Sequence, residues 1–316
     1  MTTIHDAYIN ALLADATYAL SAEGTYSGAD LKDLSDLKAR MTPTLANFIG
    51  DNFYAATHID ASDNPLLGTG FDATVWRGNA GTEFAGKTYV SLTGSEALAD
   101  FAVADLNLTV SGAAVNQIVD MVNWWLKNTT AINQQAQQIT WNGGAFANIA
   151  TVTGTGIITE RSNIVVDGHS LGGHLATAFT RLFGGQAGWS IDHTYTYNSA
   201  GFTGSSEGIF KQIEALLGTG VSKGYFEGLV GQSNFFAENG INVTTRTFLN
   251  GQEGLRTPLF NEESTGLPNH YMYKLTDALA LGDAIARLDN TFDTAKMSAL
   301  FDKGANCNGL MKWDTN

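Results

Sequence analysis

The residues with the clearest chemical potential are five consecutive ones, 168–172, which read Gly-His-Ser-Leu-Gly. The run before them, Ile164-Val165-Val166-Asp167, is rich in β-branched residues and predicts a short buried strand. After them, apolar residues recur at helical spacing from Leu171 to Leu182. Where a strand turns sharply into a helix, flanking glycines keep Cβ atoms out of the bend and the serine hydroxyl stands clear of the backbone. The pattern therefore predicts that Ser170 is a catalytic nucleophile.

The alternative interpretation of this segment is an ordinary glycine-rich turn that binds a phosphate at the start of a helix. Such a turn would carry a phosphate-loop or dinucleotide-binding signature. Neither G-x-x-x-x-G-K-[ST] nor a G-x-G-x-x-G after a strand occurs in the chain. The nucleophile interpretation of Ser170 is therefore preferred.

A serine nucleophile needs a base, and the base needs an acid that orients it. In the α/β-hydrolase fold, which presents its nucleophile on such a turn, the chain order is serine, acid, histidine. This order excludes the histidines that precede the nucleophile, which are His5, His58 and His169. His174 lies one turn along the predicted helix, and His193 precedes a strand at the wrong end of a parallel sheet. His270, in a loop before a predicted helix over 273–288, is the predicted base.

The acid should follow a strand and lie between Ser170 and His270 in the chain. Glu253 comes just after the alternating run 243–249, which predicts a strand. Glu262 and Glu263 are alternatives that lie closer to His270 in sequence. Each of the three is also interpretable as a solvated loop carboxylate. Glu253 is preferred, and the other two stay open.

The tetrahedral intermediate of acyl transfer requires backbone donors aimed at its oxyanion. The amide of Leu171, the residue after the nucleophile, is the predicted first donor. Thr93-Gly94-Ser95 ends an earlier predicted strand, and Ser95 offers both an amide and a hydroxyl. The sequence thus predicts an oxyanion hole formed by Leu171 and Ser95, with a plain strand-ending turn as the alternative for 93–95.

These residues must be held by a larger framework. Strand-like runs alternate with helical patterns, so the expected fold class is α/β, with a mainly parallel central sheet and helices on both faces. No linker or internal repeat divides residues 1–316, which predicts a single domain. Residues 1–70 are expected to be mainly helical. Residues 204–240, rich in Phe and Leu, fit either a helical lid-like insertion over the serine or a helical excursion packed against the core, and the two stay open. The predicted strands are 71–76, 88–92, 164–167, 194–197 and 243–249, and the predicted helices include 4–20, 31–48, 97–127 and 171–182.

The charge and residue composition of the chain exclude several classes of binding partner and site. The net charge of −14 gives no positive surface for nucleic acid or for anionic membranes. The single cysteine, Cys307, provides neither an internal disulfide nor a thiolate zinc site. The first 20 residues lack a basic start and carry Asp6 and Asp15, which is unlike a cleaved secretory signal. No apolar run of about 18 residues predicts a transmembrane segment.

Three segments together resemble a known group of enzymes. The 168–173 elbow, the 92–96 turn and Asn269-His270 with the following 273–279 are similar to the lipase class 3-like branch of α/β-hydrolases. Within it, the resemblance is to bacterial extracellular lipases and phospholipases A1 that are exported without a cleaved signal peptide, and it covers about residues 70–290. It implies ester hydrolysis by Ser170 and His270, with Ser95 and Leu171 in the oxyanion hole.

The chain departs from that group at two points. The group usually has Arg before the glycine of the oxyanion turn, where this chain has Thr93. Its acid is usually Asp, but no Asp lies between Asp192 and His270, so a Glu would have to serve. The calcium-binding repeat tail that many members carry is absent from residues 1–316.

The function expected from these observations is that of a lipolytic carboxylic-ester hydrolase, a phospholipase A1 or a triacylglycerol lipase, acting on lipid at an interface. No cofactor is expected, and a structural calcium ion stays open. The resemblance implies secretion without a cleaved signal, with an export or accessory protein as a further partner, and a cytoplasmic location as the alternative. Competing functions are an esterase of soluble esters, a peptidase with the same triad, and a toxin or interaction protein with little turnover.

Overall fold

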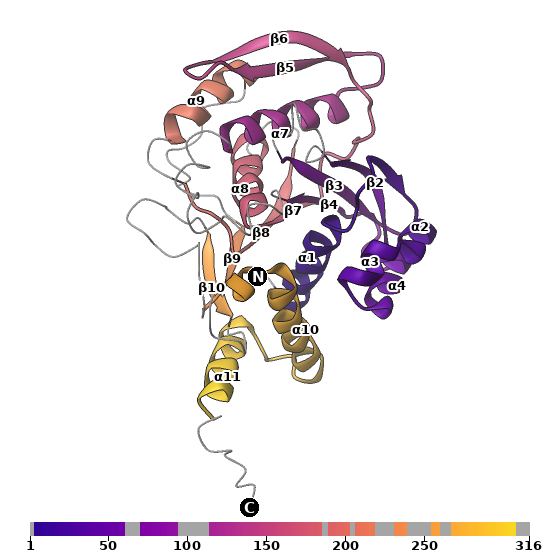
Figure 1. Ribbon diagram of the computed structural model, residues 1–316, viewed down its shortest axis with the longest axis vertical. Coiled ribbons are helices and arrows are strands. Elements are labelled where there is room, and N and C mark those ends of the chain that lie inside the picture. Colours follow the sequence, from indigo (N-terminus) through magenta and orange to yellow (C-terminus); the bar gives the residue numbers. More distant parts are fainter. Residues whose placement is uncertain are drawn as a thin grey trace, which may run out of the picture.

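The computed structural model describes residues 3–60, 70–93, 114–184, 189–202, 206–218, 231–238, 254–259 and 267–307. In these ranges, an eight-stranded sheet lies between two layers of helices (Figure 1). Its strand order is β1-β2-β3-β4-β7-β8-β9-β10. The strands are β1 (Gly24–Tyr26), β2 (Phe53–Asp60), β3 (Asp72–Gly78), β4 (Thr88–Thr93), β7 (Ile164–His169), β8 (Ile191–Tyr197), β9 (Gln232–Ala237) and β10 (Leu255–Leu259).

The sheet is mixed rather than mainly parallel throughout. From β4 across β7, β8 and β9 to β10 all neighbours are parallel. From β1 to β4 all neighbours are antiparallel. The expected parallel sheet is therefore confirmed for the half that contains the elbow strand β7, and it is wrong for the other half. The carboxyl ends of β4, β7, β8, β9 and β10 share one edge, where ligand sites form in parallel sheets.

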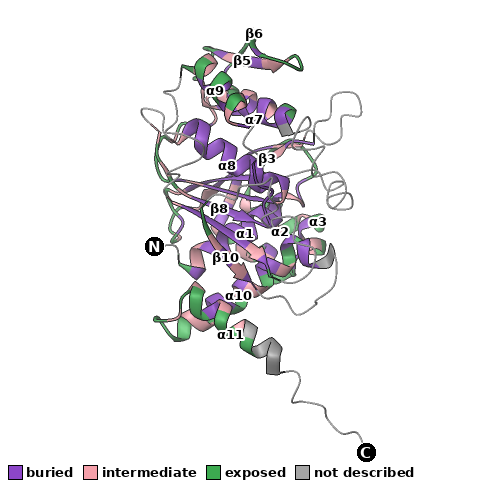
Figure 2. Cartoon of the chain, turned by 90° about the vertical axis from the view of Figure 1, so that its left-hand side faces the viewer, coloured by how far each residue is buried: buried purple, intermediate pink, exposed green. Residues whose placement is uncertain are grey.

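Helices cover both faces of the sheet, as expected. One face carries α7 (Ala114–Thr129) and α8 (Leu171–Phe183), and outside them a hairpin packs on α7 and on α9 (Ser206–Leu217). The hairpin strands are β5 (Gln135–Trp141) and β6 (Phe146–Thr153). The opposite face carries α1 (Ile4–Thr17), α2 (Gly28–Asp33), α3 (Ser35–Arg40), α4 (Pro43–Asn52) and α10 (Met272–Leu288), while α11 (Thr294–Cys307) packs on β10. Burial is deepest in the sheet, α8 and α1, whereas α11 and the hairpin present exposed residues (Figure 2).

Several expected elements differ from the observed ones. Residues 1–70 contain strands β1 and β2 as well as helices. The helix expected over 31–48 is divided into three short helices, because Leu34 is extended and Pro43 begins α4 with Thr42 as its cap. The hairpin β5–β6 and helix α11, which follows α10, were not predicted. The expected strand 243–249 and the first part of the helix expected over 97–127 lie outside the described residues.

Of the two alternatives for 204–240, the described residues favour the packed excursion for helix α9, and the expectation of helix is wrong for residues 232–237. Residues Gln232–Ala237 form β9, a strand of the central sheet, and Phe235 is 1% exposed there. Helix α9 is fixed to α8 through Arg181, which pairs with Glu207 and Glu214 and is itself buried. A helix held by a buried ion pair and by Phe210 in the core is part of the framework. Residues 219–230 lie outside the described part of the chain.

Asp167 is a buried carboxyl in the elbow strand. Burial raises its pKa well above the usual value of 3.8, and Ser91, its pairing partner on β4, acts in the opposite direction. Between pH 3.8 and the folded-state pKa, the native protein binds more protons at this site than the unfolded chain does, so this site makes the protein less stable as pH rises.

Replacing Asp167 by Asn, which does not titrate, should remove this pH-dependent loss of stability. The free energy of unfolding of Asp167→Asn minus that of the wild type, measured by urea titration, should increase as pH rises above about 4, by up to about 1.4 kcal/mol per pH unit. Other titrating groups are common to both proteins and cancel in the difference. A difference that is constant with pH would show that Asp167 is not held protonated.

Candidate active site

The predicted strand, turn and helix around Ser170 are present. Strand β7 ends at His169, α8 begins at Leu171, and Ser170 lies between them with φ 56° and ψ −119°. The Ser170 side chain is partly exposed at the edge of the sheet where the parallel strands end. The turn therefore presents the hydroxyl outward, as the sequence pattern predicts.

A positive φ is strained for a residue with a Cβ, at a cost of about 1–3 kcal/mol. Four backbone hydrogen bonds hold Ser170 in this conformation. Its N–H donates to the carbonyl of Tyr197 at 2.9 Å, and its carbonyl accepts from the N–H groups of Gly173, His174 and Ala200. Because the end of β8, the segment just after it and the first turn of α8 all bond to this residue, the strained conformation is fixed before any substrate binds.

The two glycines of the motif are required because other backbone atoms lie too close to them to leave room for a Cβ. A Cβ on Gly168 would lie 2.2 Å from the carbonyl oxygen of Gly172, and a Cβ on Gly172 would lie 2.0 Å from that of Leu92. Gly172 therefore brings the first turn of α8 directly against the end of β4. This contact explains in physical terms why the pattern needs glycine at both positions.

His270 lies within hydrogen-bond distance of the nucleophile. It ends the 3₁₀ turn η2 (Leu267–His270), and its Nε2 is 2.9 Å from Ser170 Oγ. The side chain is 2% exposed, and this burial lowers its pKa to about 4. The imidazole is therefore neutral at pH 7 and can accept the serine proton. The structure thus brings together the predicted nucleophile and the predicted base, which are 100 residues apart in the chain.

The second ring nitrogen of His270 indicates where an acid belongs. When Nε2 accepts from Ser170, the ring proton is on Nδ1. His270 Nδ1 is buried and has no hydrogen-bond partner among the described residues. A buried N–H needs an acceptor, and a carboxylate would also raise the pKa of the ring.

The predicted acids Glu253, Glu262 and Glu263 lie outside the described residues. The strand ends near them are described. Gly254 lies at the amino end of β10, beside Gln232 of β9, whereas Leu259 is the last residue of β10 at the carboxyl edge. Glu262 and Glu263 thus follow the edge where Ser170 lies, and Glu253 precedes the strand. Glu238, which is not among the predicted acids, directly follows β9 at that edge, and its side chain is exposed.

The oxyanion hole is described in part. Leu171 is the first residue of α8, where N–H groups have no acceptor within the helix. Thr93, the last residue of β4, lies against Gly172, because a Cβ there would be 2.7 Å from the Cα of Thr93. Ser95 lies outside the described residues.

The other histidines occupy structural positions. His174 is buried, stacks on Phe202 and contacts the Gly201 carbonyl through Nδ1. His193 lies within β8 and contacts Ser233, and His58 contacts Thr74 between β2 and β3. His5 contacts Asp283 on α10. The rings of these four make these contacts and not one with the Ser170 hydroxyl; His174 bonds to Ser170 only through its backbone N–H.

Two polar residues that the sequence reasoning did not assign to the site contact His270. Asn198 follows β8, and its Nδ2 lies 3.1 Å from the carbonyl oxygens of Asn269 and of His270. Its Oδ1 accepts from the N–H of Ala237 at the end of β9. His169, at the second position of the motif, contacts the His270 carbonyl through Nε2 at 2.7 Å. The only sequence signal for either residue is its place at the carboxyl end of a parallel strand.

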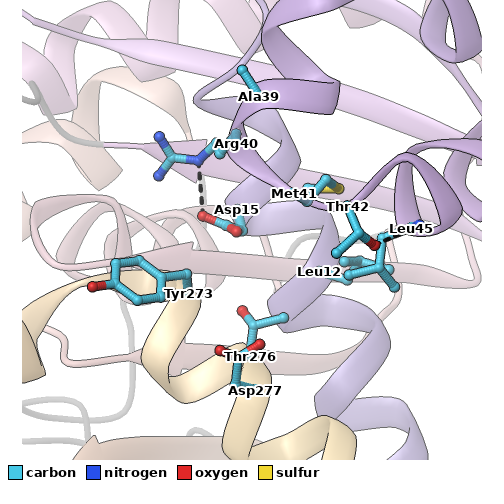
Figure 3. Close-up of a pocket in the computed structure, with 10 residues that line it drawn as sticks. All are labelled: Leu12, Asp15, Ala39, Arg40, Met41, Thr42, Leu45, Tyr273, Thr276 and Asp277. Atoms are coloured by element: carbon cyan, nitrogen blue, oxygen red, sulfur yellow. Dashed lines mark hydrogen bonds and ion pairs between the residues drawn. The ribbon is translucent and has the colours of Figure 1, made fainter. Parts of the chain in front are cut away.

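A cleft of about 390 Å³ lies on the α1 side of the sheet, between α1, the α3–α4 segment and α10 (Figure 3). Arg40 and Asp15 form an ion pair in its wall, and Tyr273 and Asp277 of α10 face them. Ser170 and His270 do not line it. In the described part of the chain, no three His, Cys, Asp or Glu side chains are grouped to hold a metal ion.

Within the described residues, every helix is too short or too polar to span a bilayer. Comparison with known proteins gives little further guidance. No family model matches the chain, and no curated protein matches it. Among solved structures, the Lip2 lipase from Yarrowia lipolytica is similar at 12% sequence identity and a TM-score of 0.39, over 80% of this chain and 76% of that one.

Proposed function

We propose that this protein is a serine carboxylic-ester hydrolase of the α/β-hydrolase type that acts on lipid esters. The observation that carries the proposal is the 2.9 Å approach of His270 Nε2 to the hydroxyl of Ser170 on a strained strand–turn–helix. A nucleophile and a neutral base in this geometry are what acyl transfer requires. The proposal is independent of the solved lipase structure, whose similarity is too low to support it.

The reaction proceeds through an acyl-enzyme. Ser170 Oγ attacks the ester carbonyl carbon while His270 Nε2 takes its proton, and the N–H of Leu171, with Ser95, stabilises the oxyanion. Collapse of the tetrahedral intermediate breaks the ester C–O bond, and His270 returns the proton to the leaving alcohol. Water then attacks the acyl-enzyme with His270 again as base, releasing the carboxylic acid and restoring Ser170.

A carboxylate that accepts from His270 Nδ1 completes the proposed triad. Glu262, Glu263 and Glu238 follow strands at the edge of the sheet that carries Ser170, so they are favoured over Glu253. No cofactor has a place in this mechanism.

The lipid substrate is supported by the surface that follows the base. Tyr271 and Tyr273 stack on each other and are 37% and 44% exposed, and Lys274 lies over the Tyr273 ring. Tyrosine and lysine are typical of segments that contact the polar region of a bilayer. We therefore propose a phospholipase A1 or triacylglycerol lipase activity at a lipid surface, in a secreted protein.

The decisive experiment compares wild type with Ser170→Ala on phosphatidylcholine vesicles and on a triacylglycerol emulsion, with product identification. Release of fatty acid and 2-acyl lysophospholipid by wild type alone is the expected result for a phospholipase A1, and release from the emulsion alone identifies a lipase. Labelling of wild type but not Ser170→Ala by a fluorophosphonate, without release from either lipid, would contradict the lipid substrate and favour soluble esters. Absence of labelling would contradict the enzyme itself and favour an interaction protein.

A further inference from the structure

The backbone carbonyl of His270 is held by two buried side chains from neighbouring strands. His169 Nε2 lies 2.7 Å from this oxygen and Asn198 Nδ2 lies 3.1 Å from it. His169 ends β7 and Asn198 follows β8, and both are at most 5% exposed. These two contacts connect the loop that carries the base to the parallel strands, and one strand continues directly into the nucleophile.

The direction of the His169 contact fixes the tautomer of its ring. A carbonyl oxygen only accepts, so His169 Nε2 must carry the proton that it donates to His270. Burial, followed by the nearby His270 ring, lowers the pKa of His169 well below its usual value, so the ring is neutral. A neutral imidazole protonated on Nε2 has a lone pair on Nδ1, which must be an acceptor.

Tyr18 supplies the hydroxyl that Nδ1 needs. Its Oη lies 3.1 Å from His169 Nδ1, and because that nitrogen carries no proton in the tautomer set by the His270 carbonyl, Tyr18 must donate. Tyr18 follows the last turn of α1, on the face opposite α7 and α8. The guanidinium of Arg40 lies 4.6 Å from the centre of its ring, and Arg40 Nε donates to Asp15 Oδ1 at 2.9 Å, in the wall of the cleft shown in Figure 3.

We propose that Tyr18 and His169 are positioning residues for the catalytic histidine, an inference that rests on the proposed function. The Tyr18 hydroxyl selects the Nε2–H tautomer of His169, and that N–H anchors the His270 carbonyl so that His270 Nε2 stays within reach of Ser170. In the other tautomer, the lone pair of His169 Nε2 would face the carbonyl oxygen and repel it. Helix α1 thereby sets the position of the base from the far side of the sheet.

A double-mutant cycle tests the proposal. Tyr18→Phe keeps the ring under Arg40 and removes the hydroxyl, and it should lower kcat on a soluble ester and the rate of fluorophosphonate labelling by about tenfold, with KM unchanged. His169→Leu removes both ring nitrogens, and in that background Tyr18→Phe should change kcat by less than about twofold. His169→Gln, whose amide can donate to the carbonyl, should be more active than His169→Leu. Tyr26→Phe on β1, which removes a hydroxyl bonded to the Ala22 carbonyl, is the matched control and should stay within about twofold of wild type.

A spectroscopic measurement tests the tautomer without any need for activity. In protein carrying ¹⁵N-histidine, the His169 signals, assigned by their loss in His169→Gln, should show a proton on Nε2 and none on Nδ1. Tyr18→Phe should give a mixture of the two tautomers. A proton on Nδ1 in wild type, or equal effects of Tyr18→Phe in both backgrounds, would overturn the positioning role. Absence of labelling in wild type would instead contradict the proposed function, while the tautomer result would still stand.

Discussion

Replacing His270 by Gln is expected to lower kcat for ester hydrolysis by about 10⁴-fold or more, with little change in KM. The reason is that, among the described residues, His270 Nε2 is the base that lies within hydrogen-bond distance of Ser170 Oγ, at 2.9 Å. Without it, the serine proton has no acceptor as the nucleophile attacks, and the leaving alcohol has no proton donor. Steady-state kinetics on a soluble ester, with active sites counted by fluorophosphonate labelling of wild type, measures the effect.

His193→Gln is the matched control for that variant. It makes the same chemical change in β8, where His193 contacts Ser233 and not the nucleophile. It should retain kcat within a few-fold, and both variants should unfold at temperatures close to that of wild type. Retention of more than a tenth of wild-type kcat by His270→Gln would exclude His270 as the base.

The same assay identifies the acid from its effect on pH dependence. Burial alone lowers the pKa of His270 to about 4, and an ionised carboxylate on Nδ1 raises it. The acid limb of kcat/KM in wild type should therefore lie above pH 4. The acid can be found by replacing each candidate in turn with Gln, at Glu238, Glu253, Glu262 and Glu263. The variant in which the triad acid has been replaced should show its acid limb of kcat/KM shifted towards pH 4, with kcat lowered by about 10²- to 10⁴-fold.

Replacing Gly172 by Ala should destabilise the fold by at least about 3 kcal/mol, or prevent folding. The added methyl would lie 2.0 Å from the carbonyl oxygen of Leu92 and 2.7 Å from the Cα of Thr93. Both contacts are with backbone, which cannot rotate away as a side chain can, so α8 must separate from β4. Urea unfolding followed by tryptophan fluorescence measures the loss.

Gly208→Ala is the control that separates crowding from the general effect of replacing a helical glycine. A Cβ at Gly208 in α9 meets no atom within 4 Å. Alanine there should leave stability unchanged or raise it by about 0.5 kcal/mol, because Ala forms helices better than Gly does. A Gly172→Ala protein as stable as wild type would show that α8 and β4 are not in close contact.

The parts of the site that the sequence predicts correctly are those with strong local signals. The elbow has a strong local signal, a β-branched strand, paired glycines and an amphipathic helix within 164–182, although Tyr197 and Ala200 complete the hydrogen bonds that fix Ser170. His270 was found by chain order, and its 2.9 Å contact with Ser170 confirms that the pair is brought together. The acid and Ser95 stay predictions, because they lie outside the described residues.

The features that the sequence did not predict depend on tertiary contacts. Nothing near Tyr18 indicates that its hydroxyl contacts a residue 151 positions away. Strand β9 is not indicated by the sequence, because Phe235 and Phe236 in a glycine-rich stretch fit an apolar surface segment as well as a strand. Strand β2 was missed next to α4, since Phe53–Asp60 alternates too little to distinguish a strand from a helical continuation.

The packing of α1 against α10 has a consequence for biosynthesis. His5 of α1 contacts Asp283 of α10, 278 residues later in the chain. At ribosomal rates of about 5–20 residues per second, α1 waits tens of seconds for the helix that covers it. Ser170 emerges in the same interval without its base, which lies 100 residues further on. Ser170 and His270 are therefore brought together only after residue 270 has been synthesised.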